Sequence, residues 1–94
     1  MRIVKYPVAT HVTPNGVTYH STEVVSYLPN GGVRLNTGGW FTNTTKQRMN
    51  QYNQRGVYIF QRKGEWFASF EGKEYPYKDG MEFYPATAAR VVYA

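Results

Sequence analysis

Turn signals recur at short intervals along the chain, and their spacing constrains the fold more than any other feature. Gly, Pro and Asn in these combinations favour tight turns and interrupt helices. They stand at positions 14–16, 29–32, 63–64, 71–72 and 79–80. Only short elements fit between them, and the intervening runs are rich in Val, Tyr, Phe and Trp, which suit a pleated, half-buried surface. The pattern predicts a mainly β fold.

The runs between the signals are the predicted strands. They are Ile3–Tyr6, Val17–His20, Glu23–Leu28, Val33–Thr37, Val57–Arg62, Trp66–Phe70, Lys73–Tyr77, Met81–Tyr84 and Arg90–Tyr93. Two connections, Lys63-Gly64 and Glu71-Gly72, are short enough to form β-hairpins. Rings within strands usually face a core. On that ground the sequence places Trp66, Phe67 and Phe70 in the interior.

One segment departs from this pattern and predicts a helix. Residues 44–54 contain neither Gly nor Pro, and Gly56 follows as a C-terminal stop. The N-cap oxygen is expected from Thr42, Asn43 or Thr44. One helical face, packed on the sheet, is expected to hold Thr45, Met49 and Tyr52. The Asn and Gln side chains of the remaining face are expected to be exposed.

Together these elements predict an α+β fold that is mainly β. We expect a strongly bent antiparallel sheet or a small barrel, with one short helix inserted at about residues 44–54. The length of 94 residues fits a single domain spanning 1–94.

Charge is segregated along the chain. From Val24 to Gly64 there is no acidic residue, whereas five of the six carboxylates lie within 65–82. The net charge is +5. A segment of one sign concentrates electrostatic potential on part of a folded surface, which is typical of proteins with an anionic partner.

The start of the predicted helix is a candidate anion site. Gly38 and Gly39 lead through aromatic residues into a hydroxyl-rich turn that is followed by Lys46 and Arg48. Cations at a helix N-terminus oppose the macrodipole, unless an anion bound by the backbone N–H groups offsets this cost. In the alternative interpretation the two glycines only form a turn and the cations are solvated.

Basic and aromatic residues alternate across the acid-free segment, which is typical of nucleic-acid binding. Single-strand binders combine a positive groove with rings on which bases stack. A free nucleotide would be recognised by the same residue types. The candidate nucleic-acid or nucleotide-binding residues are Arg34, Gly39, Trp40, Thr44, Thr45, Lys46, Arg48, Tyr52, Arg55, Arg62 and Lys63.

Residues suited to catalysis are scarce. The chain has no Cys, two His and a single Asp, Asp79. We therefore expect no enzyme activity, no cofactor and no metal site. No run of apolar residues approaches the roughly 20 that would span a bilayer, so no membrane partner is expected.

Three blocks of sequence resemble a family of small proteins encoded by tailed bacteriophages. They are the strand-like Tyr19–Val25, the Gly-Gly-Trp to Met-Asn-Gln block at Gly38–Gln51, and the Glu-Trp-Phe hairpin at Phe60–Phe67, followed by Asp79-Gly80-Met81. The resemblance covers roughly residues 17–84. It implies a phage origin and a location in the cytoplasm of an infected bacterium, and it implies no activity.

The first functional hypothesis is a non-enzymatic phage accessory protein that binds nucleic acid through a basic, aromatic-lined face. The alternative is a host-takeover or anti-defence protein that sequesters a small nucleotide signal or caps a host protein. A minor structural component of the virion is a second alternative. Exposed strand edges also permit a homodimer.

Overall fold

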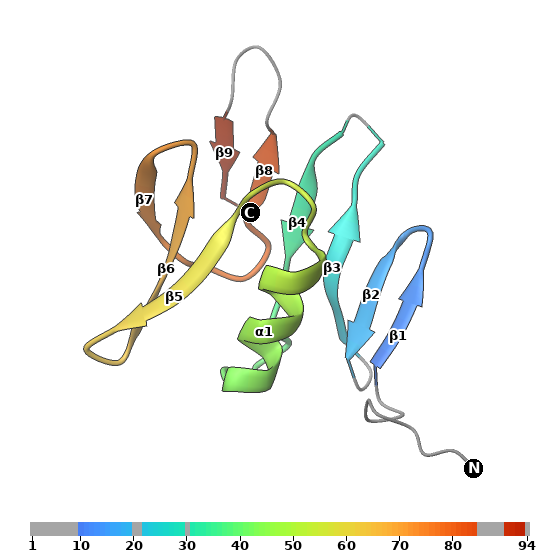
Figure 1. The fold of residues 1–94 in the computed structure, drawn as a ribbon, viewed down its shortest axis with the longest axis horizontal. Coiled ribbons are helices and arrows are strands. Elements are labelled where there is room, and N and C mark those ends of the chain that lie inside the picture. Colours follow the sequence, from blue (N-terminus) through green and yellow to red (C-terminus); the bar gives the residue numbers. More distant parts are fainter. Residues whose placement is uncertain (1–9, 20–21, 30, 85–89, 94) are drawn as a thin grey trace.

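The computed structural model describes residues 10–19, 22–29, 31–84 and 90–93. Figure 1 shows strands on both sides of one helix in the chain order. The elements are β1 (Thr10–Thr13), β2 (Gly16–Tyr19), β3 (Thr22–Tyr27), β4 (Val33–Leu35), α1 (Asn43–Tyr52), β5 (Tyr58–Arg62), β6 (Glu65–Phe70), β7 (Lys73–Pro76), β8 (Glu82–Tyr84) and β9 (Arg90–Val92). The predicted class, mainly β with one short inserted helix, is confirmed.

The described strands form two open antiparallel sheets. The larger has the order β1-β2-β3-β4-β8-β9 and the smaller the order β5-β6-β7. The closed barrel is therefore not formed within the described part of the chain. The C-terminal hairpin returns to the first sheet, because β8 pairs with β4 through Val33–Phe83 and Arg34–Glu82.

Strands β2 to β9 correspond to eight of the predicted runs, with ends that differ by two residues at most. The predicted strand Ile3–Tyr6 lies outside the described residues. Strand β1 is an addition that the sequence did not predict. Its residues Thr10–Thr13 are mostly exposed and lack an alternating apolar pattern, and the strand forms by pairing with β2.

Both predicted hairpins are present, and their turns explain the Gly positions. The backbone φ angles are 53° at Lys63 and 81° at Gly64, and 52° at Glu71 and 81° at Gly72. Two successive positive φ values match the twist of a two-residue hairpin, and Gly adopts them without a steric cost. These turns place β5, β6 and β7 in register.

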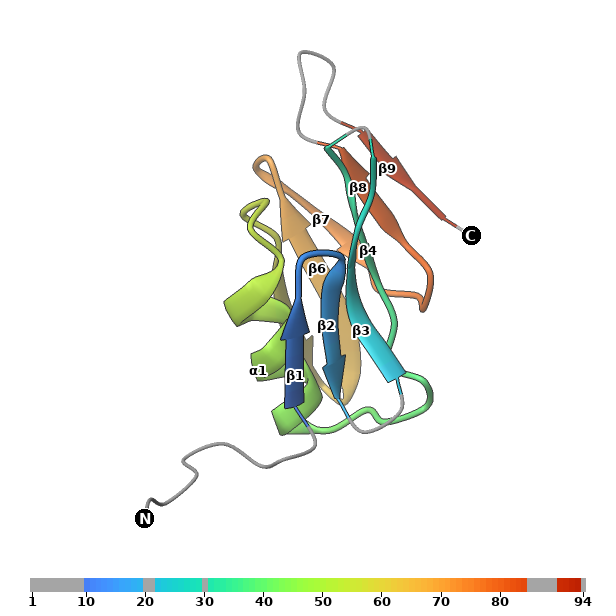
Figure 2. The same ribbon diagram turned by 90° about the vertical axis from the view of Figure 1, so that its right-hand side faces the viewer.

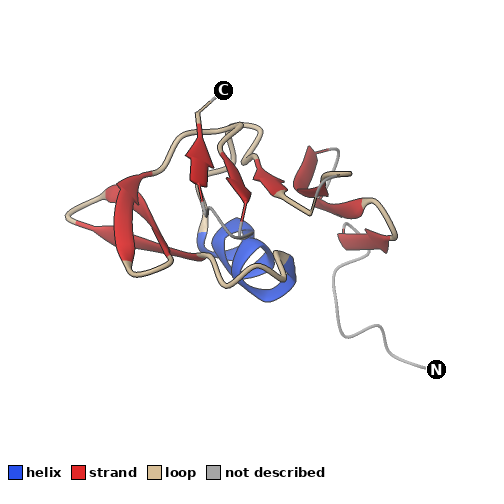
Figure 3. Cartoon of the chain, turned by 90° about the horizontal axis from the view of Figure 1, so that it is seen from above, coloured by secondary structure: helices blue, strands red, loops and turns tan. Residues whose placement is uncertain are grey.

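The core lies between the larger sheet, the helix and the inner face of the smaller sheet. Figures 2 and 3 show α1 and the smaller sheet on one side of the larger sheet. Met49 of α1 is fully buried in the same cluster as Leu35, Ile59 and Phe83. Thr45 is also buried and Tyr52 packs against the cluster, so the predicted helix face is confirmed.

Two sequence expectations about burial are wrong. Asn53, assigned to an exposed polar face, is only 2% exposed, because its amide nitrogen and its amide oxygen both bond backbone atoms. Trp66 and Phe70 are buried as predicted, whereas Phe67 is only half-buried. Phe67 lies one residue after Trp66 in β6, so its side chain projects to the opposite, solvent-facing side of the sheet.

Candidate nucleic-acid interface

Lys46 leaves the start of the helix and reaches the smaller sheet. Its Nζ donates to Gln61 Oε1 at 2.9 Å and lies 5.3 Å from the centroid of the Trp66 ring. Both contacts stabilise a cation that would otherwise oppose the helix macrodipole. The positive charge of the first helical turn is thus carried to the side of β5.

Arg48 is placed elsewhere. The residue is 8% exposed, and its Nε donates to Thr10 Oγ1 in β1 at 3.2 Å. The helix start itself is capped internally, since Thr42 Oγ1 accepts from the Thr45 N–H at 3.2 Å. Lys46 and Arg48 therefore contact different elements, and anion binding at the helix start stays a prediction. Thr42 is the capping residue among the three that the sequence offered.

The segment before the helix is a turn, and the close packing or backbone conformation at its two positions, 38 and 39, requires glycine. A Cβ on Gly38 would lie 2.3 Å from Thr22 Oγ1, so this backbone passes too close to β3 for any side chain. Gly39 has a φ of 92° and faces open space. Trp40 is 50% exposed beside it. Thr44 is half-buried in the first helical turn and Thr45 is buried.

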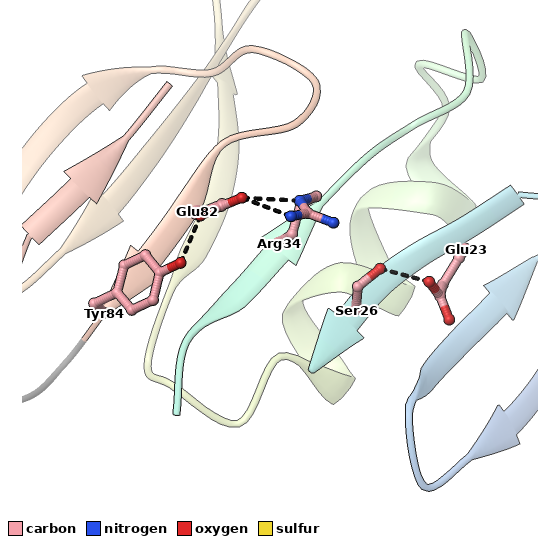
Figure 4. Close-up of polar contacts among 5 residues, drawn as sticks. All are labelled: Glu23, Ser26, Arg34, Glu82 and Tyr84. Carbon is pink, nitrogen blue, oxygen red and sulfur yellow. Dashed lines mark hydrogen bonds and ion pairs between the residues drawn. The ribbon is translucent and has the colours of Figure 1, made fainter. Parts of the chain in front are cut away.

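Arg34 lies on the side of the larger sheet that faces away from the helix. Figure 4 shows its guanidinium bonded to Glu82, the cross-strand partner in β8. The shortest N–O distance of this ion pair is 2.7 Å. Hydrogen bonds from Tyr84 and then from Arg34 hold the pKa of Glu82 below its ordinary value. On the same face, Ser26 donates to Glu23 at 2.7 Å.

The residues at the helix end have structural contacts. Arg55 Nε donates to the Gly31 carbonyl at 2.6 Å and fixes the turn between β3 and β4. The Tyr52 carbonyl accepts from the Tyr27 hydroxyl at 2.6 Å, and the Tyr52 side chain is half-buried. Arg34, Arg48 and Arg55 thus lie apart from Lys46. Whether any of the predicted residues binds nucleic acid stays a prediction.

Three rings on the outer face of the smaller sheet form what we call the aromatic row, Tyr58, Phe60 and Phe67. Tyr58 and Phe60 stack at 6.0 Å between centroids, and Phe60 and Phe67 at 5.7 Å. Tyr58 is 59% exposed. The alternation of strand residues produces the row, because positions 58 and 60 share a face and Phe67 is opposite Phe60.

Cations border the aromatic row. The Arg62 guanidinium lies 5.2 Å from the centroids of both Phe60 and Phe67. It forms an ion pair with Glu74 at 3.1 Å, and about half of each side chain is exposed. Lys63 is exposed at the adjoining hairpin turn. Of the predicted cations, Lys46, Arg62 and Lys63 are therefore brought to one side of the molecule.

A cleft of about 330 Å³ runs between α1 and β5. We call it the helix–strand cleft, and its lining residues are Asn43, Lys46, Gln47, Asn50, Tyr58, Ile59, Phe60 and Gln61. Most of these side chains are polar amides or rings, and Tyr58 and Phe60 belong to the aromatic row as well. The candidate residues from the sequence did not include Tyr58 or Phe60, and Phe67 was assigned to the interior. Their alternation along β5 and β6 was the available signal.

Within the described residues, no group of three His, Asp or Glu side chains is arranged to hold a metal ion. No helix in the same part of the chain is long and apolar enough to cross a membrane.

The chain was compared with models of protein families. A family model described as Kyanoviridae Gp96 protein matches residues 6–84, most of the chain. This confirms the relation to phage proteins that the three sequence blocks indicated. No curated protein and no solved structure matches the chain.

Proposed function

We propose that this chain, which belongs to the Kyanoviridae Gp96 protein family of phage proteins, binds single-stranded nucleic acid without catalysing a reaction. The observation that carries the proposal is the aromatic row, three rings stacked on a sheet face that no other described element covers, with Arg62 beside them. Rings with accessible faces are the platforms on which unpaired bases stack, and each stacked base contributes roughly 1–3 kcal/mol.

The neighbouring cations suit a phosphate backbone that follows β5. Lys46 lies at the helix–strand cleft with its Nζ bonded to Gln61, and Arg62 and Lys63 follow Gln61 at the end of β5. Releasing Arg62 from Glu74 costs little, since exposed ion pairs contribute only about 0–1 kcal/mol. Glu65 and Glu74 stand on the β6 and β7 side of the same face. A strand of phosphates would therefore run along the β5 side, away from these carboxylates.

Truncation of the most exposed ring tests the proposal. Tyr58→Ala should weaken binding of a labelled oligothymidylate about tenfold at low salt, measured by fluorescence anisotropy, because it removes one stacking platform. Val12→Ala is the control, since Val12 is equally exposed at 58% but lies on β1, at the far edge of the larger sheet. It should leave affinity within twofold.

Trp40→Ala tests whether a different exposed ring is the stacking platform. Trp40 is the exposed ring that the sequence pattern favoured, on the loop before α1. Loss of binding in Trp40→Ala together with unchanged binding in Tyr58→Ala would contradict the assignment to the aromatic row. No binding of the unaltered protein to oligothymidylate at low salt would contradict the proposed function itself.

A free nucleotide is the second candidate ligand. The volume of the helix–strand cleft, about 330 Å³, is in the range of small-molecule pockets. A protein that sequesters a nucleotide signal would use this cleft with a ring on the base and Lys46 on the phosphate. Calorimetry against a panel of mononucleotides distinguishes sequestration from single-strand binding. Saturable one-to-one binding of a mononucleotide, with no higher affinity for an oligomer, would favour sequestration.

A further inference from the structure

We infer that the outer edge of β5 at Gln61 is a nucleobase-binding subsite, in which the backbone N–H and C=O of Gln61 pair with the edge of a base. This inference rests on the proposed function and assigns one base of the bound strand to the helix–strand cleft. It follows from how the same strand edge is bonded at its two preceding outward-facing positions.

At those two positions a side-chain carboxamide from α1 or its C-cap residue pairs with the backbone of β5 or of the residue directly before it. Asn53 bonds Val57, with Nδ2 donating to the carbonyl at 2.8 Å and Oδ1 accepting from the N–H at 3.1 Å. Asn50 bonds Ile59 in the same way, at 3.0 and 2.6 Å. Each amide thus takes the place of a neighbouring strand along an edge that no described strand covers.

The next outward-facing backbone position is Gln61. In an antiparallel pair, alternate residues direct both backbone groups away from the partner strand, so Gln61 shares the direction of Ile59. The helix residue next in the series 53, 50 is Gln47. Three helical residues advance about 4.5 Å but two strand residues about 6.8 Å, so the elements fall out of step at this point. No contact joins Gln47 to the Gln61 backbone among the described hydrogen bonds, and both residues line the cleft.

A nucleobase fits the position that a third amide would occupy. Bases carry a donor beside an acceptor on a flat edge, as a carboxamide does, and Asn and Gln pair with bases through this similarity. Gln47 and Asn43 add further donors and acceptors at the cleft wall, and Tyr58 and Phe60 supply ring surface at its side. Lys46, at the same cleft, suits the phosphate of that nucleotide.

The experiment uses ¹⁵N-labelled full-length protein and an eight-residue oligothymidylate. On titration, the backbone amide resonance of Gln61 and the side-chain amide of Gln47 should shift, and exchange of the Gln61 amide with solvent should slow. An abasic oligomer of the same length should shift the amides around Lys63 and leave Gln61 unchanged, because it carries phosphates without bases.

Matched helix variants give the second readout. Gln47→Leu should weaken oligothymidylate binding about tenfold, whereas Gln51→Leu, the same change at an exposed helix position outside the cleft, should leave it within twofold. Thermal unfolding checks that both variants fold. If the unaltered protein binds but Gln61 does not shift and the two variants bind equally, the subsite is overturned while the proposed function stands. If no oligomer binds, both are overturned.

Discussion

At the scale of single residues, the fold depends on side-chain amides that replace a missing strand. Asn53 contacts the helix end and the segment that leads into β5, accepting from the Arg55 and Val57 N–H groups and donating to the Met49 and Val57 carbonyls. An amide has both a donor and an acceptor, so no other small side chain satisfies this set of backbone groups. This one side chain thus bonds the backbone on both sides of the connection from α1 to β5.

Removing the Asn53 amide should therefore destabilise the protein strongly. Asn53→Ala leaves the buried N–H and C=O of Val57 without their partner, each costing about 1–3 kcal/mol, so a loss of roughly 2–4 kcal/mol in the free energy of unfolding is expected. Urea denaturation measures it. Gln51→Ala, at an exposed position of the same helix, should change stability by less than about 0.5 kcal/mol. A small effect at Asn53 equal to that at Gln51 would contradict this role.

Sequence reasoning could not identify these amides. Asn and Gln on a helix face usually meet solvent, and nothing in residues 44–54 distinguishes Asn50 and Asn53 from the exposed Gln47 and Gln51. Their role depends on a strand edge that arrives beside α1 only after the chain has turned at Gly56. The helix itself was predictable, because its cap, its buried face and its stop are all local signals.

At the scale of elements, the C-terminal hairpin β8–β9 completes the larger sheet by pairing with β4. The backbone bonds Leu35 N–H to Met81 O and Gly80 N–H to Leu35 O guide the chain into this position. Asp79 accepts from the Thr37 N–H and hydroxyl, which ties the two turns together. Each strand had its own turn signals, but the pairing of β8 with β4 joins distant segments and no local pattern encodes it.

Acid should weaken this junction through Glu82. Its pKa is lowered in the folded state by the hydrogen bonds from Tyr84 and Arg34, so the bonds stabilise the fold above the ordinary Glu pKa of about 4.3. The contribution is lost as the pH falls through the lower, folded pKa. The difference in unfolding free energy between the unaltered protein and Glu82→Gln should be largest above pH 5 and shrink below it. A difference independent of pH would contradict the coupling.

At the scale of the whole molecule, folding redistributes the charge that is segregated in the sequence. Arg34 and Arg62 are paired with Glu82 and Glu74, from the acidic C-terminal part of the chain. Arg48 and Arg55 bond groups of the fold itself. The run of cations in the sequence indicated an anionic partner, whereas the fold places only some of these cations beside the aromatic row. Lys46, Arg62 and Lys63 remain beside the aromatic row because β5 and the helix meet there.

This selection predicts a shallow salt dependence. Three phosphate contacts on a single strand give a slope of about −2 in a plot of log affinity against log salt concentration. Anisotropy titrations from 50 to 300 mM salt measure the slope. A steep dependence, near −5 or beyond, would require the cations on the other faces to take part and would contradict a surface restricted to the β5 side.

The most direct test compares bases with backbone. The affinity for an oligothymidylate is measured beside that for an abasic deoxyribose-phosphate oligomer of equal length and charge. Stacking on the aromatic row predicts that the abasic oligomer binds at least tenfold more weakly, and that Tyr58→Ala reduces this difference. Equal affinities for the two oligomers would contradict the account, because phosphate contacts alone would then explain the binding.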